Sequence, residues 1–122
     1  RFVQLPFNLA MPEALVLANQ TFQGAQVSLL EAARALEVTV VASASILQGK
    51  VARDLAPEVR EPLGSLATDA LTAIQFVRST PGIATALVGM SRLAHVEENL
   101  QLARIEPARP DQYQQLFSTG EA

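Results

Sequence analysis

The apolar residues of the chain form short runs separated by longer, patterned segments. Residues 2–9, 38–42 and 84–88 are compact and rich in β-branched or aliphatic residues, which is typical of strands. The run at 38–42 is almost continuously apolar, as expected for a parallel strand covered on both faces. Pro6 cannot donate a backbone hydrogen bond, so we expect the first strand to end early.

Two segments between these strands show the three- and four-residue spacing of a helix with one apolar side. The first is residues 27–37. The second follows Thr68, a suitable N-cap, and carries Asp69 in its first turn, where a carboxylate suits the helix dipole. Pro81 and Gly82 end it. The apolar sides consist of Leu29, Leu30, Ala33 and Leu36 in the first helix and of Leu71, Ile74 and Val77 in the second.

A third helix is predicted after the last strand. Residues 89–91 read as a tight turn, and Ser91 is a suitable cap for a helix over residues 92–104. Two prolines then break the chain before a surface helix over residues 111–117. The core-facing side of the third helix is expected to consist of Leu93, Val96, Leu100 and Ala103.

The remaining segments read as connections. Residues 10–24 look partly irregular, and residues 45–66 read as a long loop with room for a short helix. The resulting order β-α-β-α-β-α-α predicts an α/β fold with a parallel sheet and right-handed crossovers. Three strands are too few to close a barrel, but they fit strands 6, 7 and 8 of an eight-stranded one.

Composition narrows the class of protein. With 122 residues, 49% of them hydrophobic and 17% charged, the chain suits one globular domain. The absence of cysteine excludes disulfides and thiolate metal sites, and a single histidine excludes a multi-histidine metal site. A net charge of -3 argues against nucleic acid or an anionic membrane as partner. We see no membrane span or signal peptide, so we expect a cytoplasmic protein, either processed or a fragment.

Three segments carry a resemblance to a known family. Residues 2–8, Phe-Val-Gln-Leu-Pro-Phe-Asn, are similar to a strand with a glutamine and a following aromatic–Asn pair. Residues 41–49 stand in the place of an Ala-Tyr-Ser-Pro-Leu-Gly-x-Gly segment. Residues 87–92 and 95–100, ending in Glu-Asn-Leu, look like a loop and helix that grip an adenosine phosphate. In this order and spacing the segments resemble the aldo/keto reductase family, from Phe2 to about Ile105.

The resemblance implies a (β/α)8 TIM barrel that reduces aldehydes or ketones by hydride transfer from NADPH. Residues 1–122 would be a single incomplete domain, the C-terminal half of that barrel. The family's catalytic Asp, Tyr, Lys and His lie on the first four strands, which have no counterpart here. Tyr113 and His95 lie elsewhere, so we expect no catalytic residue and no activity from these residues alone. The missing half, or another copy of the chain, would be the partner.

The resemblance also assigns cofactor contacts. Phosphates often bind TIM barrels after strands 7 and 8, at the N-terminus of a helix. Gln4 would bind the nicotinamide carboxamide from a strand end, and the backbone around Ala44 would approach the pyrophosphate. Two positions depart from the family: Ser43 stands where an aromatic ring is common, and His95 where a basic residue is common. The full predicted NADP-binding set is Gln4, Ser43, Ala44, Ile46, Gln48, Gly89, Met90, Ser91, Arg92, His95, Glu98 and Asn99.

Other readings of the same residues stay open. Gly89 and Ser91 also suit an ordinary turn and cap, and the polar helix residues suit a solvated face. Gln4 could satisfy a backbone group, and three phenylalanines, Phe7, Phe22 and Phe76, are expected in the core. The alternatives to a reductase are a half-barrel that serves as an interaction or regulatory module, and another βα barrel that binds a flavin through its phosphate.

Overall fold

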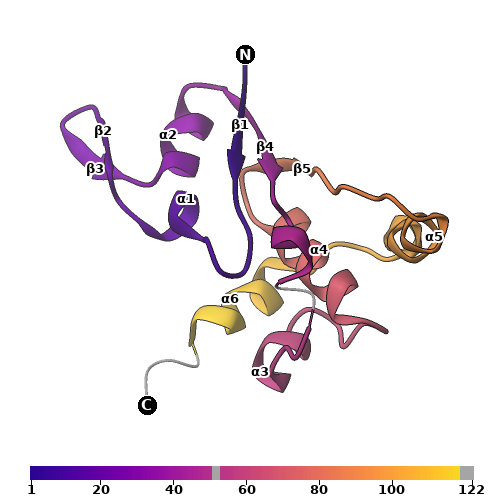
Figure 1. The fold of residues 1–122 in the computed structure, drawn as a ribbon. Coiled ribbons are helices and arrows are strands. Elements are labelled where there is room, and N and C mark those ends of the chain that lie inside the picture. The colour runs from indigo at the N-terminus through magenta and orange to yellow at the C-terminus, as the bar shows by residue number, and fades with distance from the viewer. Residues whose placement is uncertain (51–52, 119–122) are drawn as a thin grey trace.

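The computed structural model describes residues 1–50 and 53–118, with every side chain except that of Gln48. Its strands and helices alternate along most of the chain (Figure 1). The strands are β1 (Phe2–Pro6), β2 (Gln20–Phe22), β3 (Ala25–Val27), β4 (Thr39–Ser43) and β5 (Ile83–Ala86). The α-helices are α1 (Glu13–Val16), α2 (Leu29–Ala35), α3 (Pro57–Arg60), α4 (Asp69–Ser79), α5 (Leu93–Leu100) and α6 (Pro110–Ser118), and the 3-10 turns are η1 (Leu47–Gly49) and η2 (Gln101–Arg104).

The main sheet has three parallel strands in the order β1-β4-β5, as predicted. The register places Gln4 beside Val41, and Val40 beside Ile83. α2 lies in the connection between β1 and β4, and α4 lies in the connection between β4 and β5. The structure therefore confirms an α/β fold in which helices connect parallel strands.

One face of this sheet is packed and the other is bare. Val40 and Ala42 of β4 are buried, and Val3 and Leu5 of β1 pack against the same cluster. The residues between them face the other way: Gln4 is exposed, and Phe2 is 80% exposed. Because only one face is covered within the described residues, the sheet has the one-sided burial of an opened barrel wall.

Stacked aromatic rings hold the last helix on the packed layer. The ring of Phe76 in α4 lies 5.5 Å from that of Phe7 and 5.6 Å from that of Tyr113, nearly parallel to both. All three are buried, which confirms Phe7 and Phe76 as core residues. Phe22 was predicted wrongly, because it lies on β2 and is only half-buried, outside the core clusters.

Helix ends follow local chemistry. Ser28 caps α2 in a capping box with Glu31, and the Thr68 hydroxyl accepts from Leu71 N at 3.2 Å at the start of α4. The predicted Thr68 cap is thus confirmed. α4 ends with Thr80 as its C-cap, just before the expected stop at Pro81.

The segment predicted as partly irregular, residues 10–24, contains α1 and the first strand of a hairpin that the sequence did not predict. β2 and β3 pair antiparallel around Gln23 and Gly24, both with positive φ (49° and 80°). That conformation suits a two-residue hairpin turn, for which Asn-Gly is the strongest signal. Because Gln23, and not asparagine, occupies the first of the two turn positions, the sequence lacked that signal.

The third long helix differs from its prediction. α5 ends at Leu100 and continues as the 3-10 turn η2. Its expected core side is wrong, since Leu93 is 72% exposed, Leu100 is 61% exposed and Ala103 is exposed as well. Leu102 is buried instead. The prediction assumed a layer over that side, but among residues 1–50 and 53–118 nothing covers it. Leu36 of the first predicted helix is likewise exposed.

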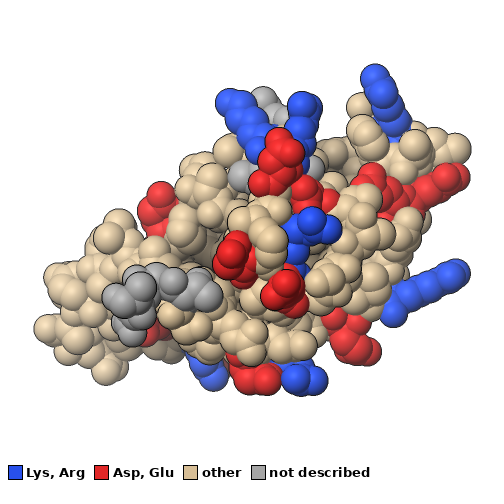
Figure 2. Space-filling model, turned by 90° about the horizontal axis from the view of Figure 1, so that it is seen from below, with Lys and Arg blue, Asp and Glu red and all other residues tan. Residues whose placement is uncertain are grey.

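The surface carries no strong charge pattern on the face seen in Figure 2. Basic and acidic side chains lie intermixed there, with apolar and neutral residues between them (Figure 2). Among the described residues, no helix has the length and apolar character needed to cross a membrane. Nor do these residues contain a group of three acidic or histidine side chains able to hold a metal ion.

Candidate functional site

A cavity of about 400 Å³ lies beyond the C-terminal ends of β4 and β5, next to α5. Its volume falls within the range typical of small-molecule sites. It is lined by Ile46, Gly49, Arg53, Ala70, Gly89, Ser91, His95, Glu98 and Asn99. Residues from two strand-end loops, from α4 and from α5 thus meet at one place, although up to 53 positions separate them in the sequence (from 46 to 99).

Several predicted cofactor residues lie around this cavity: Ile46, Gly89, Ser91, His95, Glu98 and Asn99. They come from the loop after β4, the loop after β5 and one side of α5. Arg92 is exposed at the start of α5 but is not part of the lining. Met90, 41% exposed, also stays outside it.

The remaining predicted residues lie closer to the sheet. Gln4 sits in the middle of β1 rather than at its end, so that part of its prediction is wrong. It lies on the bare sheet face together with Ser43. Ser43 pairs with Pro6, which is two residues from Gln4 on β1, so both side chains are on the same face. Ala44 directly follows β4 and is exposed, with φ of 56°. The backbone of Gln48 belongs to η1, but its side chain lies outside the described part of the structure.

Ser91 does not cap α5. The N-cap is Arg92, which makes no side-chain capping bond, and the first backbone bonds run from His95 N and Val96 N to Arg92 O. The helix starts one residue later than expected, so the Ser91 hydroxyl is one position too early to reach its amides. The first N–H groups of α5 are therefore open to an anionic ligand.

Gly89 occupies the cavity edge without any steric need for glycine. A Cβ atom built at this position would have no heavy atom within 4 Å, and its φ lies outside the positive region. Within the described residues, neither backbone strain nor packing requires glycine there. A small residue at this position leaves the backbone accessible from the cavity side.

Glu98 is held by a contact that the sequence did not suggest. Thr68 Oγ1 donates to Glu98 Oε1 at 2.6 Å, so one carboxylate oxygen is already engaged by α4. Asp69, the residue after Thr68, accepts a hydrogen bond from Leu55 N at 3.2 Å. Its carboxylate also lies 3.6 Å from Arg60 Nε. Adjacent residues at the start of α4 thus hold both α5, through Thr68, and the segment at 55–60, through Asp69.

Arg53 is a lining residue that sequence reasoning missed. It is exposed, belongs to the loop after η1, and lines the cavity together with His95 and Asn99. A guanidinium there gives the cavity a fixed positive charge, suited to phosphate. Its nearness in sequence to Gly49, within the segment of family resemblance, was the available signal.

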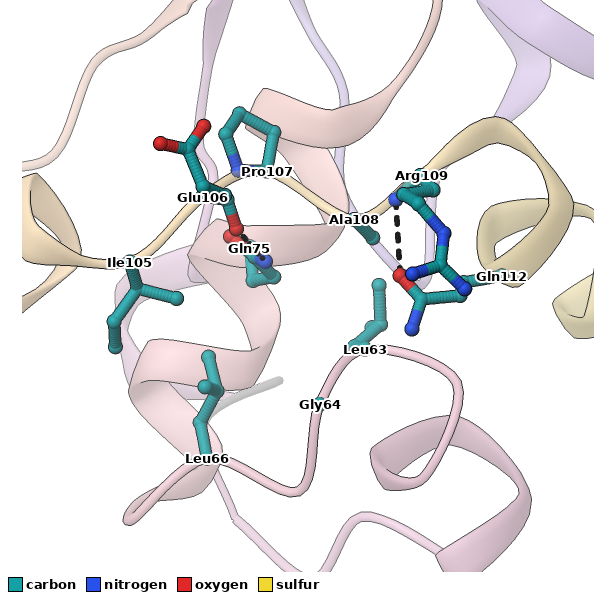
Figure 3. Close-up of a pocket in the computed structure, with 10 residues that line it drawn as sticks. All are labelled: Leu63, Gly64, Leu66, Gln75, Ile105, Glu106, Pro107, Ala108, Arg109 and Gln112. Atoms are coloured by element: carbon teal, nitrogen blue, oxygen red, sulfur yellow. Dashed lines mark hydrogen bonds between the residues drawn. The ribbon is translucent and has the colours of Figure 1, made fainter.

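A second cavity, of about 550 Å³, lies between the loop at 63–66, α4 and the segment at 105–112 (Figure 3). Two hydrogen bonds join lining residues: Gln75 Nε2 donates to Glu106 O at 2.9 Å, and Arg109 N donates to Gln112 Oε1 at 3.0 Å. These bonds fix the connection between η2 and α6 on α4. The arrangement explains packing of the C-terminal segment, and none of the predicted cofactor residues lines this cavity.

The only tyrosine of the chain is structural. Tyr113 is 1% exposed, and its hydroxyl lies 2.7 Å from Thr80 Oγ1. Burial raises its pKa to about 12, against the lowering effect of the Thr80 hydrogen bond. Such a phenol stays protonated at neutral pH and is packed against Thr80, so its role in the described structure is to hold α6 on α4.

Comparison with known proteins supports the fold. No family model matches the sequence, and the search of curated proteins found no match either. The holo form of aldo-keto reductase AKR11C1 from Bacillus halodurans superposes with a TM-score of 0.64 and 17% identity, covering 95% of this chain and 41% of that one. Its apo form gives 0.63 and 17%, covering 95% and 42%. The chain therefore spans well under half of the solved structures that it matches, and over that span it has the fold of part of an aldo-keto reductase (β/α)8 barrel.

Proposed function

We infer that these residues form the cofactor-binding half of a cytoplasmic, NADPH-dependent aldo-keto reductase. The barrel fold supports this, and so does a cavity at strand ends, where such barrels bind their ligands. The observation that carries the inference is Gly89, a glycine that the described structure does not require but that leaves backbone open to the cavity. A dinucleotide phosphate lying against that backbone accounts for it.

The lining residues suit a dinucleotide phosphate. Arg53 offers a positive charge and two parallel N–H donors. The first amides of α5 add the partial positive charge of the helix N-terminus. Asn99 and Ser91 supply neutral donors and acceptors for a ribose, while Ile46 supplies an apolar wall. One carboxylate oxygen of Glu98 bonds to Thr68 and positions α5, and the other is our proposed acceptor for a ribose hydroxyl.

When bound, NADPH would supply the hydride that reduces an aldehyde or ketone. The residues of this chain bind and orient it, and the proton for the carbonyl oxygen comes from outside them. Tyr113 is buried against Thr80 and does not take that part, and we assign His95, which lines the cavity from α5, to cofactor binding. The substrate carbonyl would reach the cofactor over the bare face of the sheet, where Gln4 and Ser43 lie.

The bare sheet face needs a partner. β1 and β5 each have one edge without a neighbouring strand in the described structure, and Phe2, Leu93 and Leu100 are exposed. Apolar surface and open strand edges of this kind are normally covered. The rest of an eight-stranded barrel is our proposed cover. A second copy of the chain, acting as a non-enzymatic module, is the alternative, and the intact mass of the purified polypeptide distinguishes the two.

The decisive experiment measures NADPH and NADH binding by calorimetry for the full-length protein and two variants. Gly89→Ala should weaken NADPH binding by about tenfold or more without changing the unfolding temperature, because the added Cβ meets only the ligand. Arg53→Gln should weaken it by a similar factor. Arg34→Gln, an exposed arginine on α2 far from the lining, is the control. Wild-type protein that binds neither nucleotide would refute the proposal, and a preference for a flavin would point to another barrel family.

A further inference from the structure

Asn8 is a polar side chain that lies completely buried at the end of β1. Its amide nitrogen donates to Ala44 O at 2.9 Å, and its amide oxygen accepts from Ala10 N at 2.8 Å. The backbone on either side is fixed as well: Phe7 N donates to Ser43 O, and Asn8 and Met11 exchange two backbone bonds. One side chain therefore joins the chain after β1 to the chain after β4.

The residue that Asn8 holds has an unfavourable backbone conformation. Ala44 has φ of 56°, in the left-handed region that a side chain with a Cβ normally avoids. Its carbonyl oxygen accepts both from Asn8 and from Leu47 N, at 2.9 Å each. A conformation of this kind persists only when its surroundings impose it. The Asn8 amide is a buried side-chain contact made directly to this residue.

The next residue continues the connection to the third strand. Ser45 is 1% exposed, and its hydroxyl donates to Leu87 O at 3.1 Å, just beyond β5. Leu87 N donates in turn to Ala42 O at 2.8 Å. The ends of β1, β4 and β5 are thus linked in order by two buried side chains, Asn8 and Ser45. Ile46 and Gly89, which line the cavity, lie one and two residues beyond these links.

We propose that Asn8 is a positioning residue for dinucleotide binding: it holds the turn at residues 44–47, and through Ser45 the loop at 87–89, in the geometry that the ligand phosphate needs. The inference rests on the function proposed above but adds a residue that touches no ligand. Asn8 is not part of the cavity lining, and its buried amide would be costly to retain for packing alone.

The test compares Asn8→Ala with Gln75→Ala in the full-length protein. Gln75 is a matched control, because its amide is also buried and also bonds a backbone carbonyl, but on α4 beside the other cavity. Both variants should lose stability. Only Asn8→Ala should also weaken NADPH binding, by about tenfold or more, and speed amide exchange at Leu47. If Asn8→Ala fails to fold, Ser45→Ala removes the second link with a smaller change and should weaken binding in the same direction.

The outcomes separate this inference from the proposed function. Wild-type protein without NADPH affinity would overturn the proposed function and with it the binding role of Asn8. Wild-type protein that binds NADPH while Asn8→Ala and Ser45→Ala bind it equally well would overturn the role of Asn8 alone. Equal loss of affinity in Gln75→Ala would do the same, since the effect would then follow general stability. Unchanged exchange at Leu47 in Asn8→Ala would show that the turn is held by other contacts.

Discussion

Thr68 and Glu98 join the two helices beside the candidate cavity through one hydroxyl. Thr68 Oγ1 donates to Glu98 Oε1 at 2.6 Å and accepts from Leu71 N at 3.2 Å. The same oxygen thus caps α4 and fixes the outward position of α5. Because His95 and Asn99 line the cavity from α5, a change at Thr68 should alter their positions and so the affinity of the cavity for its ligand.

Replacing Thr68 by Asp separates these two roles. Aspartate remains a good N-cap, but it cannot donate to Glu98 and places a second carboxylate beside it. We expect the variant to lose about 1–2 kcal/mol of unfolding free energy at neutral pH and to bind NADPH several-fold more weakly. Thr68→Ser keeps both bonds and is the control. Chemical denaturation and calorimetry measure the two effects, and equal behaviour of the Asp and Ser variants would exclude the link.

The ionisation of Tyr113 should make stability depend on alkaline pH. Burial raises the pKa of Tyr113 to about 12, above the value of about 10 for an unfolded tyrosine. The tyrosine therefore ionises at a lower pH in the unfolded chain than in the folded one. The stability that the neutral, buried phenol contributes is complete below about pH 10. It falls by about 1.4 kcal/mol per pH unit as the pH rises toward 12. Tyr113→Phe should remove that loss at the cost of the Thr80 hydrogen bond.

The measurement is an absorbance titration of the phenolate, taken as the difference between wild type and Tyr113→Phe. The chain has one tyrosine, so the difference reports this hydroxyl. Urea unfolding at pH 9 and pH 11 gives the matching stabilities. A titration midpoint near 10 would mean that Tyr113 is open to water and that the stack with Phe76 is loose.

Arg78 should be a major contributor to the stability of the C-terminal segment. Its guanidinium donates to Gln75 Oε1 within α4, to Leu102 O of η2 at 2.9 Å, and to Ile105 O just after η2. Desolvation by burial lowers its pKa, partly offset by Glu106, yet arginine stays charged at any ordinary pH.

Arg78→Ala should therefore cost about 2–3 kcal/mol of unfolding free energy, and Arg78→Lys a large part of it, because an ammonium cannot reproduce the planar arrangement of donors. Arg109→Ala is the matched control: Arg109 pairs with Asp111 at 3.1 Å, but both side chains are mostly exposed, and we expect no measurable change. Denaturation midpoints of the Arg78 and Arg109 variants, each compared with wild type, measure these losses. Similar losses at Arg78 and Arg109 would mean that these carbonyl bonds contribute little.

Local sequence chemistry predicted much of the fold. The compact apolar runs became β1, β4 and β5, the Thr68 hydroxyl capped α4, and Leu71, Ile74 and Val77 are buried as its spacing indicated. Those predictions depended on interactions within a few residues of each other. The hairpin at 20–27 was missed because its turn has Gln23 at a position where asparagine or glycine is the usual signal.

By itself, the sequence determined the order of the three parallel strands and of helices α2, α4, α5 and α6, most of their ends to within a few residues, and the residue types gathered near each strand end. Only the tertiary structure decided that Glu98 bonds Thr68, that Arg53 lines the cavity, that Gln4 lies within β1, and that Leu93 and Leu100 face outward. The physical reason is the sequence separation of the interacting residues. Caps and periodicity depend on neighbours in the chain, whereas burial and side-chain partners depend on which distant segments the fold brings alongside.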